Sequence, residues 1–326
     1  MAGKTPLVAV TRKLPEGIER ELALRFDARL NRDDRPMDAQ TMKAAVAEAG
    51  VLVPTVTDRV GAEIVAAAGP RLKLIANFGV GFNHIDVTAA AARGIAVSNT
   101  PGVLTDATAD IAMTLMLAVT RRAIEGAKLL AAGEFTGWCP TWMMGVGLRG
   151  RKLGIVGMGR IGEAMAMRSR AFGMEIHYHK RSRAAPEVEA TLAATYWPEL
   201  DAMLPEMDIV SIHCPYTVET YHLFSHPRLA RMKASAYLIN TARGEIVDEA
   251  ALADALASGR LAGAGLDVFE HEPKVNSKLL ALKNVALFPH LGSSTIEART
   301  GMGKKVIANI IAFTEGRPLP DGVTPP

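Results

Sequence analysis

A short apolar run that ends in three spaced glycines constrains this chain more than any other feature. Residues 153–162, LGIVGMGRIG, predict a buried strand that turns at Gly157 and Gly159 and enters a helix after Gly162. In such a turn the first glycine allows the bend, the second lets the backbone approach a pyrophosphate, and the third lets the helix pack on the strand. The N–H groups and dipole of the helix N-terminus favour anions. With a second strand expected over 175–179, the pattern indicates a dinucleotide site; the alternative is a glycine-rich turn that binds nothing.

The end of the second strand bears on which dinucleotide binds. An NAD site normally has Asp or Glu about 20 residues after the glycines, where it holds the ribose 2′-OH. Here the sequence HKRSR has no carboxylate, and the cations Lys180, Arg181 and Arg183 surround Ser182. A carboxylate would repel a 2′-phosphate, whereas these cations and the hydroxyl would bind one by charge-assisted hydrogen bonds. We therefore expect NADP(H) to be preferred, with NAD(H) possible if the turn is only a solvated basic loop.

Composition and charge exclude several other classes of protein. A length of 326 residues is comfortable for two domains, and 49% hydrophobic residues with 5% aromatic ones fit an Ala/Val/Leu-rich α/β protein. The net charge is only +3, which argues against a nucleic-acid surface. Cys139 and Cys214 are too few for a disulfide framework or a structural zinc site, so no metal is expected. Residues 1–4 lack the shape of a signal peptide, and no apolar run reaches membrane-spanning length. We expect a cytoplasmic protein with no membrane or nucleic-acid partner.

Short apolar runs alternate with helical stretches along the chain, which predicts parallel sheets covered on both faces. In the first series the expected strands are 7–10, 51–53, 72–77 and 95–98, and the expected helices are 16–26, 38–48, 60–68 and 86–93. In the second series the expected strands are 152–156, 175–179, 209–213, 236–240, 263–267 and 285–288, with a helix over 163–172 after the glycines.

Two further helices complete the predicted organisation. A long apolar helix over 105–130 would connect the two series, and a helix over 294–313 comes too late for the six-strand unit, so we expect it to return to the first domain. The predicted fold class is α/β, with two doubly wound parallel-sheet domains and a cleft between them. The expected domains are a flavodoxin-like substrate domain, residues 1–98 plus 289–326, and a dinucleotide-binding Rossmann domain, residues 99–288.

Three loops follow neighbouring strands of the second series. Their sequences are NTARG, DVFEHEP and FPHLGS, and they carry Arg243, Glu272 and His290. Ligands of such sheets bind beyond the carboxyl ends of the strands, so an arginine, a carboxylate and a histidine can converge there. The other seven histidines have no such company, and we interpret them as surface, strand or turn residues.

Reduction of a 2-keto acid requires these three kinds of group. A cation must clamp the carboxylate and polarise the carbonyl, and the planar fork of arginine matches a carboxylate. An acid must protonate the developing alkoxide as hydride arrives, and a carboxylate beside a histidine favours its protonated form. The alternatives are a structural ion pair for Arg243, a plain loop carboxylate for Glu272, and a structural histidine for His290.

Several motifs, taken in order, resemble the D-isomer-specific 2-hydroxyacid dehydrogenases along nearly the whole chain. These motifs are GVGFNHID at 79–86, the glycine turn at 157–162, HCP at 213–215, NTARG at 240–244, LDVFEHEP at 266–273, and PH with GS within 289–293. The resemblance implies that Arg243 binds substrate and that Glu272 and His290 form the acid–base pair. It also implies that backbone N–H groups around Val80 and Gly81 hold the substrate carboxylate.

The full expected site combines the residue patterns with what the resemblance implies, although the basic turn at 180–183 departs from the Asp with which the family binds NAD. The expected substrate contacts are Val80, Gly81, Trp138, Arg243 and Ser293. The expected cofactor contacts are Thr108, Gly157, Gly159, Arg160, Ile161, Gly162, Lys180, Arg181, Ser182, Arg183, Cys214, Pro215, Thr241, Ala242, Asp267, His290 and Gly292.

Within the family, the segment WCPTW at 138–142 is similar to that of glyoxylate/hydroxypyruvate reductases. There a tryptophan of one subunit approaches the substrate pocket of its partner, which implies a homodimer with Trp138 near the substrate. The alternative is that Trp138 and Trp142 only pack in the subunit interface. Glu272 argues against a formate dehydrogenase, which resembles this family but carries Gln at the corresponding place.

These features together predict an NADPH-preferring reductase of short 2-keto acids, glyoxylate and hydroxypyruvate, with His290 as the general acid. One alternative is a D-2-hydroxyacid dehydrogenase of another substrate, such as 2-ketogluconate or phenylpyruvate. The other is a non-catalytic nucleotide-sensing protein of the same fold.

Overall fold

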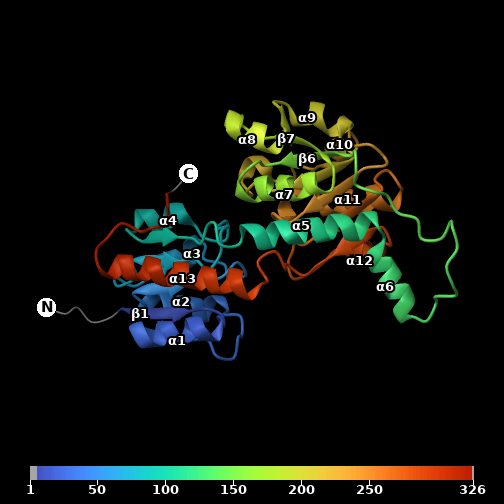
Figure 1. Ribbon diagram of the computed structural model, residues 1–326. Coiled ribbons are helices and arrows are strands. Elements are labelled where there is room, and N and C mark those ends of the chain that lie inside the picture. The colour runs from blue at the N-terminus through green and yellow to red at the C-terminus, as the bar shows by residue number, and fades with distance from the viewer. Residues whose placement is uncertain (1–5, 325–326) are drawn as a thin grey trace. The chain divides into compact units, whose positions relative to one another are not determined.

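The chain forms two compact α/β units, which the computed structural model describes over residues 6–324 (Figure 1). Unit 1 contains the residues up to Leu104 and those from Thr295 onward, and unit 2 spans Thr105–Ser294. Both junctions lie six residues further along the chain than the predicted boundaries after residues 98 and 288. Residues 1–4, considered above for a signal peptide, lie outside the described part of the chain.

Unit 1 is built on a six-stranded sheet in the order β13-β5-β4-β3-β1-β2. Its strands are β1 (Leu7–Val10), β2 (Asp27–Arg29), β3 (Val51–Val53), β4 (Leu74–Ala76), β5 (Ala96–Ser98) and β13 (Gly322–Val323). The first five are parallel in the flavodoxin-like order 2-1-3-4-5, and β13 adds an antiparallel edge. The central strands β3 and β4 are buried throughout, because helices cover both faces of such a sheet.

Five helices accompany this sheet, and three of them begin at a side-chain cap. The helices are α1 (Glu16–Arg25), α2 (Ala39–Glu48), α3 (Ala62–Ala66), α4 (Val87–Ala92) and α13 (Ile296–Thr314). Asp38, Asp86 and Thr295 each accept a backbone N–H in the first turn of α2, α4 and α13. Such caps satisfy N–H groups that have no partner within the helix, which fixes where each helix begins.

Unit 2 contains a seven-stranded parallel sheet in the order β12-β11-β10-β9-β6-β7-β8. Its strands are β6 (Lys152–Val156), β7 (Glu175–His179), β8 (Ala194–Trp197), β9 (Ile209–Ile212), β10 (Tyr237–Asn240), β11 (Gly263–Leu266) and β12 (Val285–Leu287). From β8 the order reads 3-2-1-4-5-6-7, which is the Rossmann order with one added strand. The predicted class of two doubly wound parallel-sheet domains is therefore confirmed, while the cleft between them stays a prediction.

The helices of unit 2 follow its strands and complete the βαβ pattern (Figure 1). They are α5 (Thr105–Thr120), α6 (Ala123–Ala131), α7 (Arg160–Ala171), α8 (Pro186–Leu192), α9 (Leu200–Met203), α10 (His226–Leu229), α11 (Glu249–Ala257) and α12 (Ser277–Ala281), with 3-10 turns at Leu204–Glu206, Val218–Thr220 and Gly244–Ile246. None of the described helices combines the length and apolar character that crossing a membrane requires.

The prediction of one helix over 105–130 is wrong, because the helix breaks at Arg122. The carbonyl of Thr120 accepts the N–H of Val146 at 2.9 Å, so it is not available to continue the helix. Arg122 takes a left-handed conformation, with φ of 54°, and α6 begins at the next residue. Arg122 is held there by two hydrogen bonds to Glu125, at 2.8 and 2.9 Å.

The glycine turn between β6 and α7 has the geometry that its sequence predicts. Gly157 has φ of +100°, and a Cβ atom there would lie 2.4 Å from the nitrogen of Cys214. A Cβ at Gly162 would lie 2.4 Å from the carbonyl oxygen of Gly157, whereas one at Gly159 would meet no atom within 4 Å. The first and third glycines are therefore required by packing, while the second borders open space. Helix α7 begins at Arg160, earlier than the predicted start at 163.

These contacts predict opposite outcomes for two alanine substitutions. Gly162→Ala should lower the free energy of unfolding by about 1–3 kcal/mol, because its Cβ overpacks against backbone. Gly159→Ala should change it by less than about 0.5 kcal/mol, because the loss of a favourable N-cap residue offsets the lower entropy of the unfolded chain. Denaturant unfolding of both variants measures the difference, and equal losses would contradict this account of the turn.

Candidate active site

The predicted catalytic residues lie at the carboxyl ends of three adjacent strands of unit 2. Arg243 follows β10, Glu272 lies in the loop after β11, and His290 lies in the loop after β12. Because all three strands are parallel, these loops share one edge of the sheet, where ligands of doubly wound folds bind.

Glu272 and His290 form a hydrogen-bonded pair. Nδ1 of His290 lies 2.8 Å from Oε2 of Glu272, and Oε1 of Glu272 accepts the N–H of Phe269 at 3.0 Å. Burial raises the pKa of Glu272, but the hydrogen bond and charge of His290 outweigh it, and the pKa is lowered overall. An ionised carboxylate can only accept, so Nδ1 of His290 carries a hydrogen and Nε2 is left for a ligand. The two side chains remain 30% and 33% exposed, so a small molecule can reach them.

The buried carboxylate of Asp267 holds the loop that carries His290. Its two oxygens accept the N–H groups of Leu291 and Gly292, each at 2.7 Å, and its carbonyl accepts the N–H of His290 at 2.9 Å. His290 takes a left-handed conformation, with φ of 57°, which a histidine adopts only where its surroundings enforce it. Burial raises the pKa of Asp267, and the two backbone N–H groups oppose that rise. The predicted contact of Asp267 with cofactor stays a prediction, while the structure shows that its carboxylate oxygens hold this loop.

Arg243 lies beside the same loops in extended backbone. Its guanidinium donates to the carbonyl of Ala242 at 2.7 Å. The next residue, Gly244, packs so tightly that a Cβ atom there would lie 1.9 Å from the carbonyl carbon of Phe269. Burial lowers the pKa of Arg243, and the charges of Glu245 and Glu272 oppose that effect. Arginine nevertheless stays charged, so this edge of the sheet offers a fixed cation.

Two observations fit a dinucleotide at the same edge. The open space at Gly159 would admit a pyrophosphate beside the N-terminus of α7. The buried hydroxyl of Thr241, at the end of β10, has no hydrogen-bond partner among the described residues. Buried polar groups are rarely left unpaired in proteins, so a ligand atom is the simplest partner.

Three other predicted cofactor residues, Thr108, Cys214 and Pro215, also belong to unit 2. Thr108 of α5 donates to the carbonyl of Gly292 at 3.2 Å, which ties α5 to the loop of His290. Cys214 and Pro215 follow β9, and the backbone of Cys214 packs against Gly157. Burial raises the pKa of the Cys214 thiol to about 11.

The basic turn after β7 divides into an engaged and an accessible part. Nε and Nη2 of Arg183 donate to the carboxylate of Glu189, at 2.9 and 2.8 Å. The guanidinium of Arg183 also lies 5.8 Å from the centroid of the Tyr196 ring. Glu189 also accepts the hydroxyl of Tyr178 at 2.6 Å, and these bonds lower the pKa of Glu189 to about 2. Arg183 is exposed, as are Arg181 and Ser182, and Lys180 is half-buried. The difference lies in pairing, because no side-chain hydrogen bond of Lys180, Arg181 or Ser182 occurs within residues 6–324.

In unit 1 the turn at residues 79–81 is fixed through its carbonyl groups. Asn77 donates to the carbonyls of Gly79 and Gly81, each at 3.0 Å, and Asn99 donates to that of Val80 at 2.8 Å. No hydrogen bond within residues 6–324 uses the N–H of Val80 or Gly81. These two groups are therefore available to an anion.

Sequence reasoning did not identify the two asparagines or the histidine that orients one of them. His84, which we interpreted only as a surface, strand or turn residue, has Nε2 3.0 Å from Oδ1 of Asn77. This contact sets the orientation of the Asn77 amide. The available signal was an asparagine directly after each of two apolar strands, Asn77 after β4 and Asn99 after β5.

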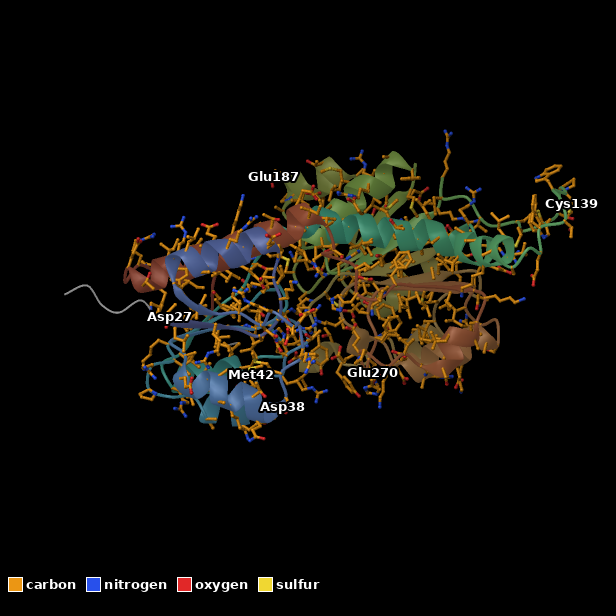
Figure 2. The ribbon with its side chains drawn as sticks, turned by 90° about the horizontal axis from the view of Figure 1, so that it is seen from below. Asp27, Asp38, Met42, Cys139, Glu187 and Glu270 are labelled. Carbon is orange, nitrogen blue, oxygen red and sulfur yellow. The ribbon has the colours of Figure 1, made fainter. Side chains whose placement is uncertain are left out.

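The segment that contains Trp138 extends away from the sheet of unit 2 (Figure 1). We call residues 122–147 the arm. Helix α6 buries none of its residues, and Figure 2 shows Cys139 at the far end of the arm. Trp138 is 79% exposed and Trp142 is 38% exposed, with its ring centroid 5.5 Å from that of Phe135. Ser293, the remaining predicted substrate contact, directly follows Gly292 and is half-buried.

Comparison with known proteins agrees with this geometry. Residues 113–292 match the family described as "D-isomer specific 2-hydroxyacid dehydrogenase, NAD binding domain". The chain is 46% identical over 320 residues to a glyoxylate reductase of Thermococcus litoralis, covering 97% of this chain and 96% of the relative. It is 45% identical over 324 residues to a glyoxylate reductase of Aeropyrum pernix, covering 98% and 96%.

A solved structure extends the likeness to three dimensions. An NADPH-dependent glyoxylate/hydroxypyruvate reductase from Sinorhizobium meliloti, in complex with NADP and malonate, superposes with a TM-score of 0.88 at 35% identity, covering 98% of this chain and 97% of that one. Sequence identity of 45–46% over nearly the full length, the matching family model and the shared fold all agree with the sequence motifs. The chain therefore belongs to the D-isomer-specific 2-hydroxyacid dehydrogenases and is an NAD(P)-dependent oxidoreductase.

Proposed function

We propose that this enzyme reduces short 2-keto acids, with glyoxylate and hydroxypyruvate as substrates and NADPH as the preferred reductant. The observation that carries the proposal is the Glu272–His290 pair, joined at 2.8 Å on the sheet edge that also holds Arg243. The names of the relatives support the substrate class, since two are glyoxylate reductases and a third is a glyoxylate/hydroxypyruvate reductase.

His290 is the proton donor in this reaction. When bound, the nicotinamide supplies the hydride that the keto carbon receives. Nδ1 of His290 is held by Glu272, so its other nitrogen, Nε2, presents a proton to the keto oxygen. As the C=O double bond becomes a C–O single bond, the oxygen takes that proton and His290 becomes neutral. Glu272 keeps its charge and stabilises the protonated histidine before transfer.

Each unit offers donors that suit an anionic substrate. The Arg243 guanidinium offers the planar donor fork that matches a carboxylate or a keto oxygen. The free N–H groups of Val80 and Gly81 provide a second anion site. Ser293 and Trp138 complete the proposed substrate contacts.

The preference for NADPH rests on Lys180, Arg181 and Ser182. These residues replace the carboxylate that would hold a ribose 2′-OH, and their side chains are accessible. Arg183 is engaged by Glu189 and therefore shapes the turn, with a smaller direct part in phosphate binding. The relative from Sinorhizobium meliloti is named NADPH-dependent, which is consistent with this assignment.

The arm is the proposed subunit interface of a homodimer. Five of its large apolar side chains are exposed: Leu130, Phe135, Trp138, Trp142 and Met144. Several exposed large apolar side chains on one segment are typical of an interaction site, and burial against a second copy would remove them from water. Trp138 is the most exposed of the five, and we propose that it approaches the substrate site of the partner.

The first test of this function is the pH dependence of keto acid reduction. Glu272→Gln removes the charge that favours protonated His290, so the alkaline limb of the kcat profile should move to lower pH. His290→Ala should lower kcat by about 10²–10⁴-fold, the usual range for general acid–base catalysis. An unchanged profile for Glu272→Gln would rule out the pairing. No NADPH oxidation with glyoxylate, hydroxypyruvate, 2-ketogluconate or phenylpyruvate would overturn the reductase itself.

The second test is cofactor choice. Each charge-assisted contact is worth about 1.5–3 kcal/mol, and exposure reduces that figure, so two contacts should favour NADPH over NADH by about 100-fold in kcat/KM. Lys180→Asp combined with Arg181→Ser should reverse the preference. Arg183→Ser serves as the matched control and should change it less, because Glu189 already pairs with Arg183. Equal kcat/KM values for both cofactors in the unmodified enzyme would show that the turn does not select.

The third test addresses the arm. Sedimentation velocity should give about twice the mass of one chain, and a monomer would contradict the interface. If Trp138 reaches the partner's site, Trp138→Ala should raise KM for glyoxylate about tenfold while KM for NADPH stays unchanged. Trp142→Ala provides the comparison, and equal effects of both variants would mean that the two rings only pack in the interface.

A further inference from the structure

The loop that carries Glu272 is bound at two points by a second, buried carboxylate. Glu249 is the first residue of α11 and is 8% exposed. Its Oε2 accepts the N–H of Glu270 at 2.9 Å, and its Oε1 accepts the N–H of Asn276 at 2.9 Å. These two amides lie on either side of Glu272 in the sequence, so one side chain brackets the catalytic carboxylate.

Glu270 strengthens the connection between the loop and α11. Its Oε2 lies 3.5 Å from the N–H of Glu249, and its Oε1 lies 2.7 Å from Nε2 of His222 (Glu270 is labelled in Figure 2). The loop is therefore fixed on the α11 side by bonds in both directions. On the other side, Gly244 packs directly on the backbone of Phe269 and Glu270.

We propose that Glu249 is a positioning residue for the acid–base pair: it holds residues 270–276 so that Oε2 of Glu272 meets Nδ1 of His290. The proposal rests on the proposed function, because it assigns a role in that same reaction. Glu249 hydrogen-bonds neither Glu272 nor His290 and acts only through the two backbone amides. A displacement of about 1 Å at a reacting group can cost about 10²-fold in rate, so a loop anchor can control turnover without touching the substrate.

The charged groups around His290 determine what loosening the loop would do. Glu272 and Asp267 face the histidine, and Arg243 acts on Glu272. If Glu272 moves away, His290 loses its nearest negative charge while Asp267 stays bound to Leu291 and Gly292. The protonated form of His290 is then less favoured, so the enzyme loses its acid at a lower pH.

Glu249→Gln tests this role, because its amide nitrogen cannot accept a backbone N–H. In steady-state reduction of glyoxylate by NADPH, kcat should fall about 10–100-fold and the alkaline limb should move to lower pH, with KM for NADPH unchanged. Glu249→Asp keeps the charge but reaches at most one of the amides, so its losses should be intermediate.

Asp248→Asn is the matched control. Asp248 immediately precedes Glu249 and caps α11 by accepting the N–H of Ala251 at 2.9 Å. Asn caps as well as Asp, so this variant removes the same charge from the same helix start without loosening the loop. Its kcat and pH profile should equal those of the unmodified enzyme. If it matches Glu249→Gln, charge at the helix start and not loop position is responsible, and the proposal fails.

Hydrogen–deuterium exchange of the segment 268–276 gives a readout that does not require activity. Exchange should be faster in Glu249→Gln than in Asp248→Asn or the unmodified enzyme, because one of the two amides loses its acceptor and the other keeps only a neutral one. Unchanged exchange, or a lower kcat with an unchanged pH profile, would overturn the positioning role. If the unmodified enzyme reduces no keto acid, the proposed function fails, and the exchange comparison still decides whether Glu249 holds the loop.

Discussion

The position of the loop that carries His290 depends on the buried carboxylate of Asp267. A charged or polar group in such a site is costly unless hydrogen bonds replace its lost water, and here the N–H groups of Leu291 and Gly292 do so. Because those bonds fix the backbone on the far side of His290, they also maintain its left-handed conformation. The position of the histidine, and hence its contact with Glu272, follows from a residue at the end of the neighbouring strand.

The same solution recurs in three loops that leave strands of the two sheets. Parallel strands end in backbone groups that the ladder no longer pairs, and some other group must satisfy them. Asp267 binds the loop after β12, Glu249 binds the loop after β11, and Asn77 and Asn99 bind the turn after β4. In each case a side chain uses the backbone of a functional loop as its partner. Such loops are rigid, which suits a site whose groups must be placed before substrate arrives.

The sequence predicts the parts of this structure in which burial leaves a continuous signal. The central strands are apolar throughout and were predicted. The prediction missed β2, β8 and β13, which lie at sheet edges and have no buried residue. The break at Arg122 has no local signal in the sequence. The hydrogen bond that accompanies it joins the carbonyl of Thr120 to the N–H of Val146, which is distant in the sequence. The contact between Glu272 and His290 was predictable, because the loops that carry them follow neighbouring parallel strands, while their acid–base roles stay a prediction. The pairing of Arg183 with Glu189 and the contact of His84 with Asn77 were not predictable. Each depends on the conformation of the chain between the two residues, which the sequence pattern does not specify.

The raised pKa of the Cys214 thiol affects which cysteine is oxidised first. Peroxides and alkylating agents attack the thiolate, and a thiol with a pKa of about 11 is ionised to only about one part in 10⁴ at neutral pH. The sulfur of Cys214, whose backbone packs against the glycine turn, is therefore a poor target for such reagents. In a single chain Cys139, at the exposed end of the arm, is the more accessible of the two thiols. Oxidative damage would thus reach the arm of a chain that has not yet paired with a second copy before it reaches the glycine turn.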